Sequence, residues 1–268
     1  MRWSDLAAEP EILAALDHAG EQPVDGNQNE KRAWSERFAN ACAVAVATGV
    51  RRSALGNKTI RPLDLASGTE PLTPLGVGTS KRIDVTVVDP VLGLEVGFSL
   101  KGLNFRDSRS RNFDKNLTGR MYELGDEVRL VHEHLPSAFM TGVFFLPVAA
   151  TEDKMTGNSS FANAVTKVRS RTGRLDPALH AHASRCDAAY VALYCLGGDA
   201  DGFTRGAARF FNVTGNPPQR GRPLVGDTLS LREMVDEVVS AATREDRVRW
   251  GNAEPDSERG SSDGFPAG

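Results

Sequence analysis

The chain has 268 residues, with 32 Lys and Arg against 35 Asp and Glu and a formal net charge of −3 at pH 7. With 40% apolar and 25% charged residues, the composition is that of a globular protein and excludes a disordered or collagen-like chain. No apolar run reaches the roughly 18 residues that cross a bilayer, and no signal peptide precedes Glu9. Because the three cysteines form no Cys-x-x-Cys pair either, we expect a cytoplasmic protein with no membrane partner.

The first part of the chain predicts two helices followed by irregular structure. Residues 7–19 indicate a short helix, and residues 1–28 are expected to form an N-terminal accessory arm. From Asn29, a helix cap, apolar residues up to position 48 recur at the spacing of a helix that packs along one stripe. Prolines and glycines in close succession over residues 55–81 indicate a loop.

The middle of the chain predicts a hairpin and a long helix. Residues 82–88 and 94–101 are typical of two strands joined by a turn, which indicates an antiparallel pair. After a polar loop at 104–113, apolar residues recur in steps of four and three along a helix over 114–135, which Pro136 ends.

The rest of the chain alternates strands and helices. Strands are predicted at 141–148, 188–196 and 207–213, and helices at 161–171 and 229–243. The order of elements predicts an α/β fold, one mixed central β-sheet flanked by helices, in a single domain over residues 29–250. Residues 251–268 are expected to be a disordered acidic tail.

Strand alternation places three polar residues of the hairpin together. In the first strand Asp84 points away from the face of Ile83, Val85 and Val87, because successive side chains lie on opposite sides. In the second strand one face holds Leu94, Val96, Phe98 and Leu100, and the other holds Glu95, Gly97, Ser99 and Lys101. If the strands pair, Asp84 lies beside Ser99 and Lys101; the competing interpretation is that these residues form the solvent-facing half of a hairpin.

Two short stretches carry a resemblance to a known family: Arg82-Ile83-Asp84-Val85 and Phe98-Ser99-Leu100-Lys101. Together they resemble the core of the PD-(D/E)XK nucleases, which has a helix, a strand with an Asp, a strand ending in an acid-x-Lys pair, a helix and a further strand. The runs 78–82, 101–105 and 116–120 are similar to bacterial restriction-endonuclease-like proteins. The resemblance covers about half the chain and implies a restriction-endonuclease-like core of the αβββαβ type.

The resemblance also implies a chemistry. Asp84 is then the primary ligand of Mg²⁺, and the carbonyl of Leu100 is a further oxygen ligand. The metal polarises the phosphodiester of double-stranded DNA, while Lys101 orients or deprotonates the attacking water. Because restriction enzymes cut two strands, the resemblance implies a homodimer as well.

The acid position of the family pattern is occupied by Ser99, a weaker ligand than a carboxylate, so another element must supply the second acid. Some enzymes of the family use a carboxylate on the helix after the lysine strand. In that helix Asn116, Arg120, Glu123 and Glu127 lie on one flank, which favours Glu123 as the catalytic and metal-binding acid. An intrahelical ion pair with Arg120 is the competing interpretation of either acid, and Glu30 is a rival ligand. Glu36 is expected to face solvent, and Glu95 shares the face of Ser99 but lies too far along the strand.

Charge is unevenly distributed along the chain. Residues 101–120 hold six cations against two acids, a net charge of +4, whereas residues 251–268 have a net charge of −3. Cations bind DNA phosphates without reading sequence. The predicted DNA-binding residues are Asn104, Arg106, Arg109, Arg111, Lys115, Asn116 and Arg120.

The sequence therefore predicts an Mg²⁺-dependent DNA endonuclease of the restriction type. Two alternatives stay open: a catalytically silent DNA-binding or assembly module on the same fold, with Ser99 as the trace of lost catalysis, and a structural partner protein. Plasmid nicking by variants of Asp84 and Lys101 distinguishes the first two, and salt-dependent DNA affinity distinguishes both from the third.

Overall fold

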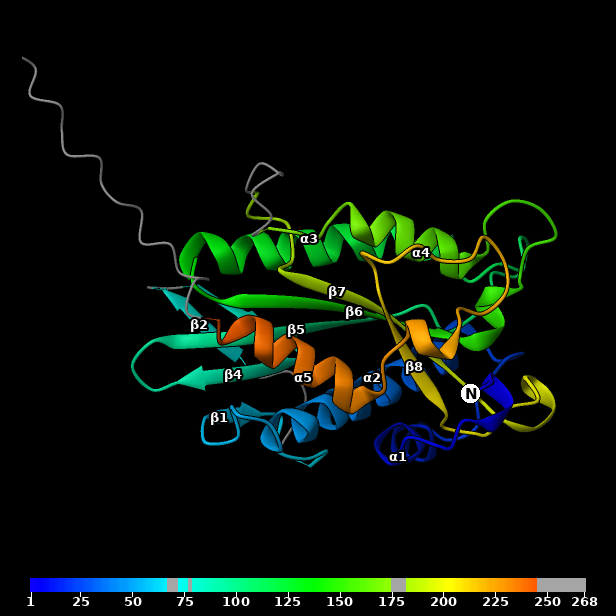
Figure 1. Cartoon of the computed structure of the whole chain (residues 1–268), viewed down its shortest axis with the longest axis horizontal. Coiled ribbons are helices and arrows are strands. Elements are labelled where there is room, and N and C mark those ends of the chain that lie inside the picture. The colour runs from blue at the N-terminus through cyan, green and yellow to red at the C-terminus, as the bar shows by residue number, and fades with distance from the viewer. Residues whose placement is uncertain (67–71, 77–78, 175–181, 245–268) are drawn as a thin grey trace, which may run out of the picture.

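A six-stranded sheet with helices on both faces forms the body of the protein, as Figure 1 shows. The computed structural model describes residues 1–66, 72–76, 79–174 and 182–244. Helices α3 (Leu117–His134) and α4 (Ser160–Arg169) cover one face. Helices α1 (Pro10–Ala19), α2 (Gln28–Arg51) and α5 (Leu231–Ala242) lie on the other. The predicted mixed α/β class is confirmed.

The sheet has the order β1-β4-β5-β6-β7-β8. Its strands are β1 (Thr59–Arg61), β4 (Val85–Asp89), β5 (Gly93–Gly102), β6 (Phe139–Pro147), β7 (Ala188–Tyr194) and β8 (Ala208–Asn212). β4 pairs antiparallel with β1 and β5, β5 to β7 are parallel, and β8 is antiparallel to β7. Strands β2 (Leu72–Gly76) and β3 (Thr79–Arg82) form a separate antiparallel pair. Helix α3 therefore links the parallel neighbours β5 and β6, as a crossover connection requires.

Helix α2 begins slightly earlier in the chain than the sequence predicted. Its cap is Asn27, two residues before the predicted Asn29, because the Asn27 side chain accepts hydrogen bonds from the backbone N–H groups of Asn29 and Glu30. The backbone N–H of Asn27 in turn donates a hydrogen bond to the Glu30 carboxylate, which completes a capping box. Trp34 and Phe38 are fully buried against the sheet, as the spacing predicted.

The strands of the predicted hairpin differ from the expected boundaries in two places. The first strand divides into β3 and β4, with Ile83 and Asp84 between them. In β5 the pairing shifts from Val87–Val96 to Val88–Leu94, so Glu95 is an extra residue at a bulge. The sequence predicted Leu94 and Val96 on the same face. Because of the bulge, Leu94 packs in the core beneath α3 and Val96 packs in the core on the opposite face.

Strands β1 and β2 lie in the stretch 55–81 that was expected to be a loop, and the other elements lie within a few residues of their predicted bounds. The helix expected over 114–135 starts with a 3₁₀ turn, followed by α3. Five 3₁₀ turns are described: Trp3–Asp5, Asp114–Asn116, Val148–Thr151, Gly198–Ala200 and Val225–Asp227. The tail at 251–268 lies outside the described residues.

Residues 1–28, expected to form an arm, contribute to the cores of the domain. Ile12 and Leu16 are fully buried in the core that α1 and α2 share with the sheet. Trp3 packs in the core on the other face, and its indole N–H donates a hydrogen bond of 2.8 Å to the carbonyl of Pro223. Among the described residues, no helix combines the length and the apolar character that crossing a bilayer needs.

Candidate functional site

An ion pair between β5 and α3 forms the centre of the candidate site. Nζ of Lys101 lies 3.0 Å from Oε2 of Glu127, and the two side chains are only 12% and 6% exposed. Burial favours the neutral amine, but the negative charges of Glu127 and Asp84 outweigh it and raise the pKa of Lys101. Lys101 is therefore a cation held at a fixed place.

Asp84 lies beside the same stretch of β5. The backbone N–H of Leu100 donates a hydrogen bond to Oδ2 of Asp84, so this carboxylate meets the strand between Ser99 and Lys101. Asp84 thus contacts β5 between Ser99 and Lys101. Ile83, however, packs in the core on the opposite face from Val85 and Val87, and not with them as predicted. The alternative of a solvent-facing hairpin is wrong, because Ser99 is fully buried and both faces of β5 at this point are covered by cores.

Two oxygen atoms near this ion pair have no hydrogen-bond partner in the described part of the chain: Oγ of Ser99 and Oε1 of Glu127. Ser99 is the register neighbour of Gly142 on β6, where a Cβ atom would lie 2.9 Å from Leu124 on α3. The glycine thus lets α3 approach the sheet closely. A buried polar atom without a partner costs about 1–3 kcal/mol, so such atoms in a native protein need an explanation, and a bound ion or water is a common one.

Glu123 and Glu30, the two acids that the sequence offered as metal ligands, form other interactions in the structure. Glu123 accepts a hydrogen bond of 2.7 Å from Arg120 and is about half exposed, which is the intrahelical ion pair of the competing interpretation. Glu30 is used in the cap of α2. Glu36 faces solvent as predicted. The acid that reaches Lys101 is Glu127, one turn beyond Glu123 on the flank that the helical spacing had already marked.

Glu95 does not share the surroundings of Ser99. Because of the bulge in β5, its Oε2 atom lies 3.3 Å from Nζ of Lys58, which also pairs with Asp89. Leu100 also differs from the expectation, because it contacts Asp84 through its backbone N–H and not through its carbonyl.

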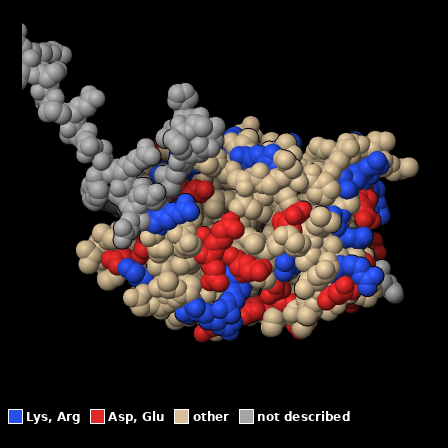
Figure 2. Space-filling view, viewed as in Figure 1, with Lys and Arg blue, Asp and Glu red and all other residues tan. Residues whose placement is uncertain are grey.

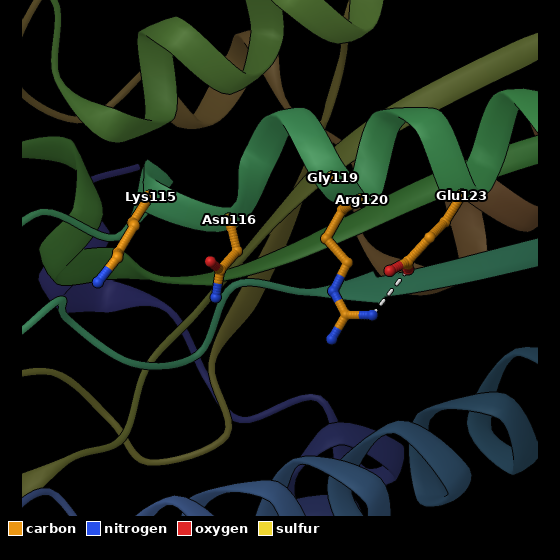
Figure 3. Close-up of a pocket in the computed structure, with 5 residues that line it drawn as sticks. All are labelled: Lys115, Asn116, Gly119, Arg120 and Glu123. Atoms are coloured by element: carbon orange, nitrogen blue, oxygen red, sulfur yellow. Dashed lines mark hydrogen bonds and ion pairs between the residues drawn. The ribbon is translucent and has the colours of Figure 1, made fainter.

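An open cavity of about 340 Å³ lies along the start of α3. It is lined by Lys115, Asn116, Gly119, Arg120 and Glu123. Figure 3 shows the side chains of Asn116, Arg120 and Glu123 extending from the same side of the helix. Three of the predicted DNA-binding residues therefore line one cavity: Lys115, Asn116 and Arg120.

The other predicted DNA-binding residues divide into exposed and buried ones. Arg106, Arg109 and Arg111 are exposed, and the guanidinium of Arg106 lies 5.2 Å from the ring centre of Phe113. Asn104 is buried, donates to Oγ of Ser35 at 3.2 Å and accepts from the hydroxyl of Tyr194. Asn104 thus holds α2 and the sheet together, and its amide is not available to DNA.

The face drawn in Figure 2 is unsuited to DNA. Asp and Glu side chains gather there over α5, whose exposed acids are Glu233, Asp236 and Glu237. Like charges repel phosphates, so this acidic patch does not favour an anionic ligand.

A second buried charged cluster surrounds Asp187 and includes His132. Asp187 accepts hydrogen bonds from Nε of Arg174 at 2.9 Å and from the backbone N–H of Met140 at 2.8 Å, and Nε2 of His132 lies 3.3 Å away. Burial raises the pKa of Asp187, but His132, Arg174 and the backbone donor lower it by more. All three partners are distant in sequence, so no local pattern could have identified the cluster.

The site fits Mg²⁺ by its donor chemistry. Among the residues described, no three His, Cys, Asp or Glu side chains group together as a full metal cage. Mg²⁺ usually takes only one or two carboxylates, with waters and substrate phosphates as further ligands. Asp84 and the unpartnered Oε1 of Glu127 supply such carboxylates, and the unpartnered hydroxyl of Ser99 lies on the same face of the strand.

No family model, curated protein or solved structure matches this chain. The chemistry assigned to the site therefore depends on its own geometry.

Proposed function

We propose that this protein is an Mg²⁺-dependent endonuclease that hydrolyses phosphodiester bonds in double-stranded DNA. The observation that carries the proposal is the buried ion pair of Lys101 and Glu127 at the stretch of β5 that Asp84 also contacts, with unpartnered oxygen atoms on Ser99 and Glu127. Two acids and one lysine are the groups that metal-dependent phosphodiester hydrolysis uses.

The order of elements supports the proposal. The sequence α2, β1, β4, β5, α3, β6 follows the αβββαβ order of the restriction-endonuclease-like core, with Asp84 before β4 and Lys101 near the end of β5. The next α-helix after the lysine strand supplies Glu127, which would replace the acid that the family pattern has at the position of Ser99. The proposed protein is thus a PD-(D/E)XK nuclease with a displaced second acid.

Each residue has a distinct role in the proposed reaction. Asp84 and Glu127 would hold the metal, which when bound polarises the phosphodiester and activates water. Lys101, a cation in its ion pair with Glu127, would donate a hydrogen bond to the attacking water and to the charge that develops on phosphorus. Glu127 keeps that ammonium group in position before substrate arrives.

Plasmid cleavage in the presence of Mg²⁺ tests the proposal. We expect Asp84→Asn, Lys101→Met and Glu127→Gln each to lower cleavage by about 100-fold or more while DNA binding persists. Glu133→Gln is the matched control, because Glu133 lies on the same helix in an exposed pair with Arg129. Full cleavage by the Glu127→Gln variant would refute the assignment of the second acid.

One observation favours a catalytically silent DNA-binding module as the second candidate. The family acid is absent at Ser99, and Lys101 neutralises one oxygen of the acid that replaces it. The silent module predicts tight, salt-dependent DNA binding by the wild type with no cleavage under Mg²⁺ or Mn²⁺.

A nuclease that cuts both strands needs two sites, so we propose a homodimer as the active form. Sedimentation of the wild-type protein with and without DNA measures the assembly, and a monomer in both conditions would contradict this part of the proposal.

A further inference from the structure

The cavity at the start of α3 is lined by side chains of the kind that bind phosphate. Its volume is about 340 Å³, and it is lined by a lysine, an asparagine amide, an arginine and one acid. At Gly119 a Cβ atom would meet nothing within 4 Å, so the absence of a side chain leaves this side of the cavity open.

The charges in the cavity are paired in the free protein. Nη1 of Arg120 lies 2.7 Å from Oε2 of Glu123, and Lys115 pairs with Asp107. Both cations are at least partly exposed, so their present partners hold them weakly. A phosphate has more negative charge and three or more acceptor oxygens to offer, and it matches the planar fork of a guanidinium.

We propose that this cavity binds one phosphate of a DNA strand and that the phosphate replaces Glu123 as the partner of Arg120. The inference builds on the proposed nuclease function and adds the subsite that positions the strand. Glu127, one of the two proposed metal ligands, follows the cavity residue Glu123 by four residues, about 6 Å along the helix. The charge of Glu123 also acts on Lys101. The phosphate bound here is thus a near neighbour of the one that is cleaved.

Two ion pairs on α3 provide a matched comparison. Arg120–Glu123 lies in the cavity and Arg129–Glu133 lies outside it, with N–O distances of 2.7 and 3.0 Å and similar exposure. The measurement is the fluorescence anisotropy of a labelled mixed-sequence duplex, in EDTA and over a range of salt concentrations. Sequence is immaterial, because phosphate contacts are the same in any DNA.

The arginine and the acid should act in opposite directions. Arg120→Gln should weaken binding about tenfold and lower the salt slope by about 1, whereas Arg129→Gln should change neither by as much. Glu123→Gln should tighten binding about threefold, because it removes the competitor for Arg120, and Glu133→Gln should not. Equal effects of the two arginine variants, or no gain with Glu123→Gln, would overturn the proposal.

Gly119 gives a test that leaves every charged side chain in place. Gly119→Ala should bind DNA as the wild type does, since a methyl group fits the open space. Gly119→Glu should weaken binding by about tenfold or more, because it places a carboxylate in the cavity. If Gly119→Glu has wild-type affinity and an unchanged melting temperature, the cavity does not bind phosphate.

The two proposals fail separately. The binding series uses no divalent metal, so its outcome does not depend on cleavage. If the cavity variants behave as expected and wild-type protein cuts no DNA under Mg²⁺ or Mn²⁺, the phosphate site stands and the nuclease function falls. If wild-type protein cuts DNA and the cavity variants bind like their controls, the subsite alone is wrong.

Discussion

Lys101 and Glu127 join β5 to α3 through an ion pair of 3.0 Å between two almost fully buried side chains. Asp84 meets the same strand through the N–H of Leu100. The three groups thus lie close together in the fold, an arrangement that suits the proposed electrostatic catalysis.

The ion pair should show strong coupling in a double-mutant cycle. We expect Lys101→Met and Glu127→Met each to lower the free energy of unfolding by about 3–5 kcal/mol, because each leaves an unpaired buried charge. The double variant should recover most of that loss, since an apolar pair replaces the two charges. Urea denaturation in EDTA measures the cycle. Additive losses in the double variant would show that the two side chains do not interact.

Ser99 should affect stability and metal binding differently. Ser99→Ala should leave the free energy of unfolding unchanged or raise it by about 1 kcal/mol in EDTA, because it removes a hydroxyl without a partner. If that hydroxyl assists Mg²⁺ binding, the stabilisation that Mg²⁺ adds in thermal melts should shrink.

Thr141→Val is the control for Ser99→Ala. Thr141 also has a buried hydroxyl without a partner, but it lies one position along β6 from Gly142, the neighbour of Ser99, and so on the other face. The variant should gain similar stability and keep the full Mg²⁺ effect. If both variants lose the Mg²⁺ effect equally, Ser99 has no specific role in Mg²⁺ binding.

Asp187 should control the acid stability of the protein. Its pKa is lowered in the folded state, so its contribution is present above the unfolded pKa of about 3.9 and is lost as pH falls through the folded value. Asp187→Asn should therefore flatten the pH dependence of urea unfolding below about pH 4. The same slope in wild type and variant would contradict this expectation.

The close approach of α3 to the sheet should depend on Gly142. Gly142→Ala should cost about 1–3 kcal/mol, because its Cβ atom would lie 2.9 Å from Leu124 and 3.4 Å from Cys186. Gly119→Ala, on the exposed side of α3, should instead stabilise the protein by a few tenths to about 1 kcal/mol. Thermal melts of both variants measure the contrast. A neutral Gly142→Ala would mean that α3 can shift without cost.

The sequence by itself determined the α/β class, the antiparallel hairpin and the neighbourhood of Asp84, Ser99 and Lys101. These features depend on periods of 2 and 3.6 residues, which are local properties of the chain. The flank of α3 that holds the second acid could also be predicted, because helical spacing groups Glu123 with Glu127.

Only the tertiary structure decided which acid reaches Lys101. Glu123 and Glu127 are equivalent in the helical pattern, and the choice depends on how α3 is placed by the packing of Leu124 over Gly142. The bulge at Glu95 has the same origin, since one extra residue changes the face of a strand without changing its local composition. Contacts between elements that are distant in the chain determine the position of α3 and the bulge in β5, so short-range sequence patterns cannot predict either.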